Sequence, residues 1–201
     1  MESEGTMGRI IVTEFVSLDG VMEDPGGAEG FKHGGWAFEF SRGDEGDKFK
    51  ADETFGSEAL LLGRVTYDGF ADAWPDREGE FADRFNSMPK FVVGAKADPA
   101  RWTNTTVLEG DPVQAARRLR EEHEGDIVVH GSAKLAQTLL EHDLVDELRL
   151  MVYPVLLGSG KRLFSEGGDK MKLRLVDSRV VGDGVAILIY EPARGANSAP
   201  H

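Results

Sequence analysis

LLLGRVTY at residues 60–67 and IVVHGSAKL at residues 127–135 are the two stretches that decide the fold. In each, an apolar run ends at a glycine, and small or polar residues then begin a helical pattern. A helix N-terminus presents free backbone N–H groups and a partial positive charge, so it attracts phosphate. Two such turns in one small domain predict a site for the two ends of a dinucleotide, and therefore a nucleotide-dependent enzyme.

Strand and helix patterns alternate along the rest of the chain. Apolar runs that predict strands occupy residues 9–16, 59–62, 90–93, 105–108, 126–129, 147–156, 173–181 and 185–190. Helical patterns occupy residues 44–55, 65–73, 77–86, 112–123 and 132–142. This order predicts an α/β fold with a mainly parallel central sheet, flanking helices and antiparallel strands at the C-terminal edge. We expect one domain over residues 8–191, a disordered leader at 1–7 and a disordered tail at 192–201.

Composition narrows the class of protein. The chain has 201 residues, a formal net charge of -13 and no cysteine. An acidic surface repels phosphate backbones, so we expect no nucleic-acid partner. No apolar run approaches the roughly 20 residues that cross a bilayer, so we expect no membrane partner and a cytoplasmic location. No Cys/His cluster has the spacing of a metal site, so no metal is expected. Because the chain is acidic overall, an anionic cofactor would require a local basic pocket.

Five short segments, in order and at compatible spacing, carry a resemblance to a known family. They are SLDG at 17–20, LGRVTY at 62–67, HGS at 130–132, LVDEL at 144–148 and PVLLGSGKRLF at 154–164. Over residues 8–191 the chain resembles the dihydrofolate reductase superfamily, and more narrowly the reductase domain of riboflavin biosynthesis and its stand-alone relatives. The resemblance implies a three-layer dihydrofolate reductase-like fold. It also implies NADPH as hydride donor, a pterin-like or aminopyrimidine-like substrate, and a homodimer built through the C-terminal strands.

The resemblance also implies which residues hold the cofactor. The first turn would contact the phosphates or the adenosine 2'-phosphate through Gly63, Arg64 and Thr66. The second turn would line the pyrophosphate through Gly131, Ser132, Ala133 and Lys134. The end of the strand at 90–93 would lie near the adenosine through Ala95 and Lys96. Each group has a plainer alternative: Arg64 in a surface ion pair, Ser132 as a helix cap, and both lysines simply solvated.

Candidate catalytic and substrate-binding residues lie in three other places. The resemblance implies that the loop containing Asp19 flanks the nicotinamide and that Asp47 lies near the place of the first-helix carboxylate of folate enzymes, so both are candidates for supplying a proton to the product. The alternatives are a turn-forming role for Asp19 and a solvated helix face for Asp47. Trp36 and Phe40, in the glycine-rich segment at 22–43, would wall a planar substrate or else pack internally.

The sequence therefore favours an NADPH-dependent reductase of a small planar heterocycle. One alternative is a riboflavin-pathway reductase of a ribosylaminopyrimidine phosphate, which would need a second basic site for the substrate phosphate. The other is a non-catalytic nucleotide-binding or interaction protein that retains the fold, because fold does not fix function.

Overall fold

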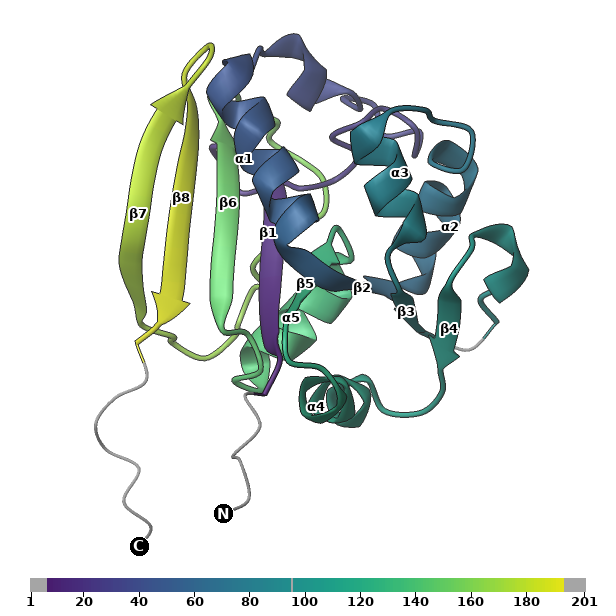
Figure 1. Ribbon diagram of the computed structural model, residues 1–201. Coiled ribbons are helices and arrows are strands. Elements are labelled where there is room, and N and C mark those ends of the chain that lie inside the picture. The colour runs from purple at the N-terminus through teal and green to yellow at the C-terminus, as the bar shows by residue number, and fades with distance from the viewer. Residues whose placement is uncertain (1–6, 95, 194–201) are drawn as a thin grey trace, which may run out of the picture.

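The computed structural model describes residues 7–94 and 96–193, and within them one sheet lies between two layers of helices (Figure 1). The strands of this sheet are β1 (Arg9–Ser17), β2 (Ser57–Gly63), β3 (Lys90–Val93), β4 (Thr105–Leu108), β5 (Asp126–His130), β6 (Glu147–Tyr153), β7 (Leu173–Val181) and β8 (Val185–Pro192). The α-helices are α1 (Gly43–Gly56), α2 (Arg64–Ala73), α3 (Glu80–Ser87), α4 (Pro112–Glu122) and α5 (Ala133–Glu141). Two short 3-10 helices, η1 (Trp36–Glu39) and η2 (Pro99–Arg101), lie in connecting segments.

The strands follow the order β4-β3-β2-β5-β1-β6-β8-β7 across the sheet. From β4 to β6 all neighbours are parallel, whereas β8 pairs antiparallel with both β6 and β7. This confirms the expected parallel sheet with an antiparallel C-terminal edge. Since β2 lies beside β5, the two glycine turns leave neighbouring strands.

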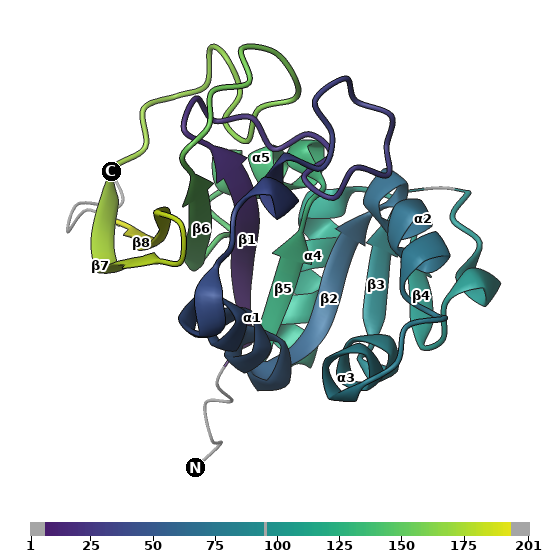
Figure 2. The same cartoon turned by 90° about the horizontal axis from the view of Figure 1, so that it is seen from above.

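Helices cover both faces of the sheet, as parallel strands require. Figure 2 shows α1, α2 and α3 in front of the strands and α4 and α5 behind them. Successive side chains of β1 point to opposite faces of the sheet, so the strand contributes to the core on each side. Ile10 and Val12 join the core under α4 and α5, while Ile11 joins the aromatic core under α2 and α3.

Most elements begin or end within a few residues of the expected bounds, and three of the differences have a clear local reason. β6 ends at Tyr153 because Pro154 has no N–H to continue the ladder. α3 begins at Glu80, because Gly79 before it has a φ of 107° and breaks the helical path. At the C-terminus, Pro192 still belongs to β8, so the expected tail begins one residue too early.

Both ends of the described chain lie at the amino ends of the parallel strands. β1 begins at Arg9, and its residue Ile11 pairs with Glu147, at the start of β6. The last strand, β8, runs back along β6 so that Tyr190 pairs with Leu148. Figure 1 shows the two ends on the same side of the molecule. The turns that follow the strands therefore lie at the opposite end. Among the described residues, no helix is long and apolar enough to cross a membrane.

Candidate functional site

The two glycine turns are joined by reciprocal hydrogen bonds. The Gly63 N–H donates to Ser132 Oγ at 2.9 Å, and the Ser132 N–H donates to Thr66 Oγ1 at 2.9 Å. Each bond connects the turn after β2 with the turn after β5. The structure thus brings together Gly63, Thr66 and Ser132, which the sequence assigned to one site.

The turn after β5 has a left-handed backbone over two residues. Gly131 has a φ of 59° and Ser132 a φ of 60°. A Cβ on Gly131 would lie 3.0 Å from Thr66 Cγ2, so the site requires a glycine there for two reasons, conformation and space. Ser132 adopts the same region with a side chain, at a cost of roughly 1 kcal/mol or more. Its two hydrogen bonds to the neighbouring turn offset that cost.

Neither helix that follows these turns is capped by a side chain. Gly63, the N-cap of α2, has no side chain, and the hydroxyl of Ser132, the N-cap of α5, bonds to Gly63 and not to its own helix. Two helix N-termini with free N–H groups therefore open at the carboxyl ends of adjacent strands. This donor set fits the two phosphate-bearing ends of a dinucleotide. Ala133 and Lys134 are the first two residues of α5 and contribute to its N-terminus.

Two cationic side chains lie at the openings of these turns. Arg64 begins α2, is about half exposed and pairs with Asp68 at 2.7 Å. Lys134 begins α5 and is exposed. The Arg64 ion pair that was the alternative to phosphate binding is therefore present, and an incoming phosphate would share or replace Asp68.

The end of β3 lies against the first turn. A Cβ on Gly94 would lie 3.2 Å from Arg64 Cβ, so the β3 end and the start of α2 are in close contact. Lys96 is exposed and has a φ of 81°. Ala95, the other residue expected near the adenosine, lies outside the described residues.

Asp19 holds two loop segments together. Its carboxylate accepts hydrogen bonds from Ser17 Oγ at 2.6 Å, from the Leu157 N–H at 3.1 Å and from the Gly158 N–H at 2.8 Å. These donors, above all Ser17, lower the pKa of Asp19 to about 2. These hydrogen bonds make Asp19 a positioning residue for the loop at 157–158. The role of Asp19 in proton transfer stays a prediction.

The same contact joins two segments that the family resemblance singled out. Val21 pairs with Arg162 in an isolated bridge, the Met22 N–H donates to the Lys161 carbonyl, and Arg162 also donates to the Asp19 carbonyl. Figure 2 shows the segment after β1 and the segment after β6 lying together at the carboxyl ends of the strands. SLDG and the segment at 154–164 therefore form one wall beside the strand ends.

The other catalytic candidate lies apart from the turns. Asp47 is on α1 with its side chain 66% exposed, and it pairs with Arg42 at 2.7 Å. Within the described residues, no hydrogen bond or ion pair connects Asp47 with Gly63, Thr66 or Ser132. The role of Asp47 in proton transfer stays a prediction.

Trp36 and Phe40 surround the ring of Tyr153. Trp36 is 1% exposed, lies 5.4 Å from the Tyr153 ring centroid and donates from Nε1 to the Glu23 carbonyl at 2.8 Å. No face of Trp36 is open to a planar substrate, which corrects that expectation in favour of internal packing. Phe40 is half-buried at 6.1 Å from the same ring, and its contact with substrate stays a prediction.

A buried carboxyl group that the sequence did not reveal supports the second turn. Glu14 of β1 is 5% exposed, and its Oε2 accepts the Gly131 N–H at 3.0 Å. Its other oxygen, Oε1, is buried and has no hydrogen-bond partner. Burial raises the pKa of Glu14 well above its ordinary value, although the Gly131 N–H and the charge of Lys50 oppose this.

A second buried polar group attaches α1 to the sheet. Lys50 Nζ donates to Thr13 Oγ1 at 3.1 Å and pairs with Glu53, whose other oxygen lies 3.4 Å from Arg149. His130, at the end of β5, lies within the field of these charges, and burial lowers its pKa to about 3. His130 is therefore neutral. Thr13, His130 and Arg149 occupy matching positions on neighbouring strands.

The segment before α1 is organised by one more buried carboxylate. Asp24 is 2% exposed and accepts the backbone N–H groups of Ala28, Glu29 and Phe31 at 2.7, 3.0 and 3.1 Å. The glycine-rich segment at 22–43, which looked like a functional loop, is therefore folded around a central acceptor. An aspartate followed by glycines marks a turn in sequence, but the three donors are fixed only by the fold.

The family of the chain follows from comparison with known proteins. The family model of the RibD C-terminal domain matches residues 9–187. The chain belongs to the RibD C-terminal domain family. This confirms the resemblance on which the expected fold and turns rested.

Relatives of this RibD C-terminal domain protein agree with the fold. The uncharacterized protein YyaP of Bacillus subtilis (strain 168) is 30% identical over 142 residues, which cover 66% of this chain and 73% of YyaP. A putative riboflavin biosynthesis protein from Shewanella sp. PV-4 is 23% identical with a TM-score of 0.75, covering 92% of this chain and 99% of that one. The dihydrofolate reductase of Enterococcus faecalis, complexed with NADP(H), is 16% identical with a TM-score of 0.56, covering 93% and 98%.

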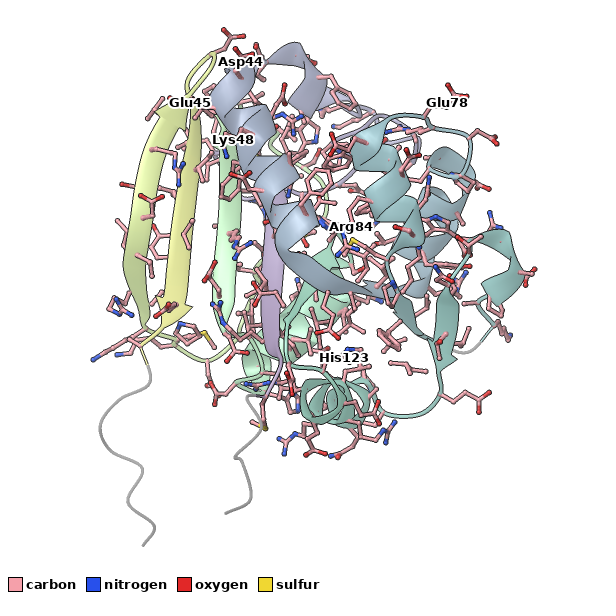
Figure 3. All side chains as sticks on the ribbon, viewed as in Figure 1. Asp44, Glu45, Lys48, Glu78, Arg84 and His123 are labelled. Carbon is pink, nitrogen blue, oxygen red and sulfur yellow. The ribbon has the colours of Figure 1, made fainter. Side chains whose placement is uncertain are left out.

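The surface of the protein also has a hollow that lies away from the two glycine turns. It has a volume of about 440 Å³ and lies between α1 and β7, lined by Glu45, Lys48, Phe49, Asp52 and Arg179. Figure 3 shows Glu45 and Lys48 projecting from the side of α1 that faces β7. None of the residues of the two turns lines this hollow, so it is not part of the candidate site. Within the described residues, no group of three His, Asp or Glu side chains is arranged to hold a metal ion.

Proposed function

We propose that this protein is an NADPH-dependent reductase that transfers a hydride to a small planar heterocycle of the pterin or aminopyrimidine type. One observation carries the proposal: two uncapped helix N-termini, joined by the Gly63–Ser132 hydrogen bond, open side by side at the strand ends. Membership of the RibD C-terminal domain family supports it, as does the fold shared with a dihydrofolate reductase complexed with NADP(H).

In this proposal each turn binds one end of the cofactor. The segment from Gly131 to Lys134 lines the pyrophosphate, and the N–H groups of Ala133 and Lys134 receive it, because those of Gly131 and Ser132 already bond to Glu14 and Thr66. Gly63, Arg64 and Thr66 line the phosphate of the adenosine end. NADPH, when bound, supplies the hydride, and binding energy at the phosphates orients its reactive ring. The wall made by SLDG and residues 154–164 excludes water beside that ring. The proton that completes the reduction comes from Asp19, from Asp47 or from water.

Two buried cations lie under α1, and each is paired with carboxylates. Lys50 pairs with Glu53, and Arg149 pairs with Glu53, Glu147 and Asp126. These pairs attach α1 to the sheet, so a substrate phosphate would be bound elsewhere. A ribosylaminopyrimidine phosphate stays the alternative substrate.

The test is a fluorescence titration of the purified protein with NADPH and with NADH. We expect NADPH to bind in the micromolar range, and Arg64→Ala to weaken NADPH roughly 10- to 100-fold, the effect of losing a charge-assisted hydrogen bond to phosphate. The matched control is Arg118→Ala, which removes an exposed arginine of α4 and should leave the affinity unchanged. If neither nucleotide binds the wild-type protein, the cofactor assignment is wrong. Binding that survives Arg64→Ala would exclude Arg64 from the phosphate site.

Activity is tested next by following NADPH oxidation with a set of pterins and aminopyrimidines. Turnover with an unphosphorylated heterocycle supports the proposal. Turnover confined to a ribosylated phosphate would favour the riboflavin-pathway reaction.

A further inference from the structure

The carboxyl group of Glu14 supports the second turn, and its two oxygens differ in their hydrogen bonding. Oε2 of Glu14 accepts the N–H of Gly131 at 3.0 Å, and Oε1 is buried without a partner. The carboxyl is 95% shielded from solvent, since Glu14 is 5% exposed. A carboxylate in such a place is costly, because each buried oxygen that lacks a donor loses its hydration without replacement.

Glu14 lies beneath the turn that leads into α5, through its hydrogen bond with Gly131. Gly131 and Ser132 lead into α5, whose N-terminus has no side-chain cap. A negative charge beneath that N-terminus occupies the positive end of the helix dipole and repels any anion that approaches from outside. A neutral carboxylic acid keeps the hydrogen bond to Gly131 without opposing an anion.

The charged groups that face Glu14 do not neutralise it. Lys50 and Glu53 of α1 act on it through the sheet with opposite signs, and they are paired with each other. Its partner in register on β6 is Leu150, which carries no charge. His130 of β5 is neutral, and Lys134 in the first turn of α5 is exposed. No neighbouring charge therefore compensates Glu14, and its charge depends on whether the carboxyl group itself holds a proton.

We propose that Glu14 is a proton-dependent positioning residue for dinucleotide binding: as the neutral acid it supports the Gly131–Ser132 turn for a diphosphate, and as the carboxylate it opposes that anion. This inference rests on the proposed function, because it takes the diphosphate of NADPH as the anion at the turn. It adds a regulated step to that function. Binding of the dinucleotide is coupled to retention or uptake of one proton at Glu14. Burial raises the pKa of the Glu14 carboxyl and so favours its neutral form.

The experiment compares three proteins: the wild type, Glu14→Gln and Glu58→Gln. Glutamine keeps the size of Glu14 and an oxygen that accepts the Gly131 N–H, but it cannot ionise. Glu58 pairs with His123 and accepts the N–H of Gly125, at the amino end of the strands. Figure 3 shows His123 at that end of the sheet. Glu58→Gln therefore removes the same charge far from the turns and controls for the overall field.

The dissociation constant for NADPH is measured by fluorescence from about pH 7 to about pH 9, above the ~6 at which a phosphate monoester titrates. For the wild type and Glu58→Gln, we expect affinity to fall roughly tenfold as Glu14 loses its proton, the effect of one charge a few ångström from an anion. Glu14→Gln should bind like the wild type at the lower pH and keep that affinity at the higher pH. Lys90, whose pKa is lowered to about 8 by burial, titrates in all three proteins and cancels in the comparison.

A second readout follows the proton itself. Calorimetric titration with NADPH in two buffers of different ionisation enthalpy should show proton uptake near pH 9 in the wild type and none in Glu14→Gln. A merely structural role for Glu14 gives a different pattern: Glu14→Gln would bind more weakly at every pH, with a curve parallel to the wild type. Parallel curves overturn the inference and leave the proposed function standing. Absence of NADPH binding at every pH overturns both.

Discussion

Asp19 shows at the residue scale how one carboxylate can hold two loop segments together. Three donors converge on it, from Ser17 and from the backbone of Leu157 and Gly158, and they hold its pKa at about 2 against an ordinary value of 3.8. A group whose pKa is lower in the folded state stabilises the fold above its unfolded pKa. That stability is lost as pH falls from about 4 through about 2.

We therefore expect Asp19→Asn to lower the free energy of unfolding by about 2 kcal/mol at neutral pH. The deficit should shrink as pH falls toward 3, because the wild type then loses the same interaction. Urea unfolding at a series of pH values measures it. Asp52→Asn, at an exposed aspartate of α1 paired with Lys48, is the control and should change stability by less than about 0.5 kcal/mol. A constant deficit at all pH values would contradict the assignment.

Residues differ in how far the sequence alone could place them. Gly63, Gly131 and Ser132 could be placed, because a glycine at the end of an apolar run leaves a local mark. Glu14 could not, since its partner Gly131 is 117 residues away. Lys90 could not either: it looks like an ordinary start of a strand, yet it is fully buried and donates to the carbonyls of Asn86, Met88 and Thr103. Burial of a charge depends on partners from several elements, which periodicity does not record.

At the scale of elements, α1 is unusual in what it turns toward the sheet. Its buried residues are Gly46, Lys50, Glu53 and Thr54, so it meets the sheet with little apolar surface. Lys50 and Glu53 connect it to Thr13 and Arg149. A helix attached in this way depends on complete pairing, because a buried charge that loses its partner is strongly destabilising.

We expect Lys50→Met to destabilise the protein by about 3 kcal/mol, because Glu53 then keeps only the longer contact with Arg149. The double variant Lys50→Met with Glu53→Met should recover part of this loss, since both buried charges are removed. Denaturant unfolding gives the stabilities. Hydrogen exchange should show the loss of protection first in residues 43–56. An additive effect of the two substitutions would show that the pair does not interact as described.

The elements themselves were largely predictable, and their associations were only partly so. Local signals placed β3, β4 and β7 at their observed bounds. The segment at 154–164 has no regular pattern, and its attachment to Asp19, Val21 and Met22 arises from hydrogen bonds between distant parts of the chain. The family resemblance identified SLDG and the segment at 154–164 only by their order along the chain. The structure shows that the two segments are in contact.

At the scale of the whole molecule, one edge of the sheet favours pairing between two copies. β7 is the outermost strand, and its exposed apolar residues include Leu175, Val176 and Val180. A two-fold antiparallel pairing centred on Ser178 would place Asp177 opposite Arg179 and Val176 opposite Val180 of the other copy. Such a pairing is complementary in both charge and apolarity. The homodimer expected from the family resemblance is therefore proposed to form along β7.

We expect sedimentation velocity to show a dimer for the wild type and mainly monomer for Val180→Lys, which puts a charge at the 70%-exposed position on the edge. Phe164→Lys, at an exposed residue outside β7, should leave the dimer intact. A wild type that stays monomeric at high concentration, or a dimer that Val180→Lys does not weaken, would refute pairing along this strand.

Both described ends of the chain lie at the amino ends of the strands, whereas the glycine turns lie at the carboxyl ends. A group attached near either end would therefore lie at the opposite end of the strands from the two glycine turns. The protein could therefore be tethered to a biosensor chip or fused to a fluorescent reporter through either end without covering the carboxyl ends of the strands, where the two glycine turns lie.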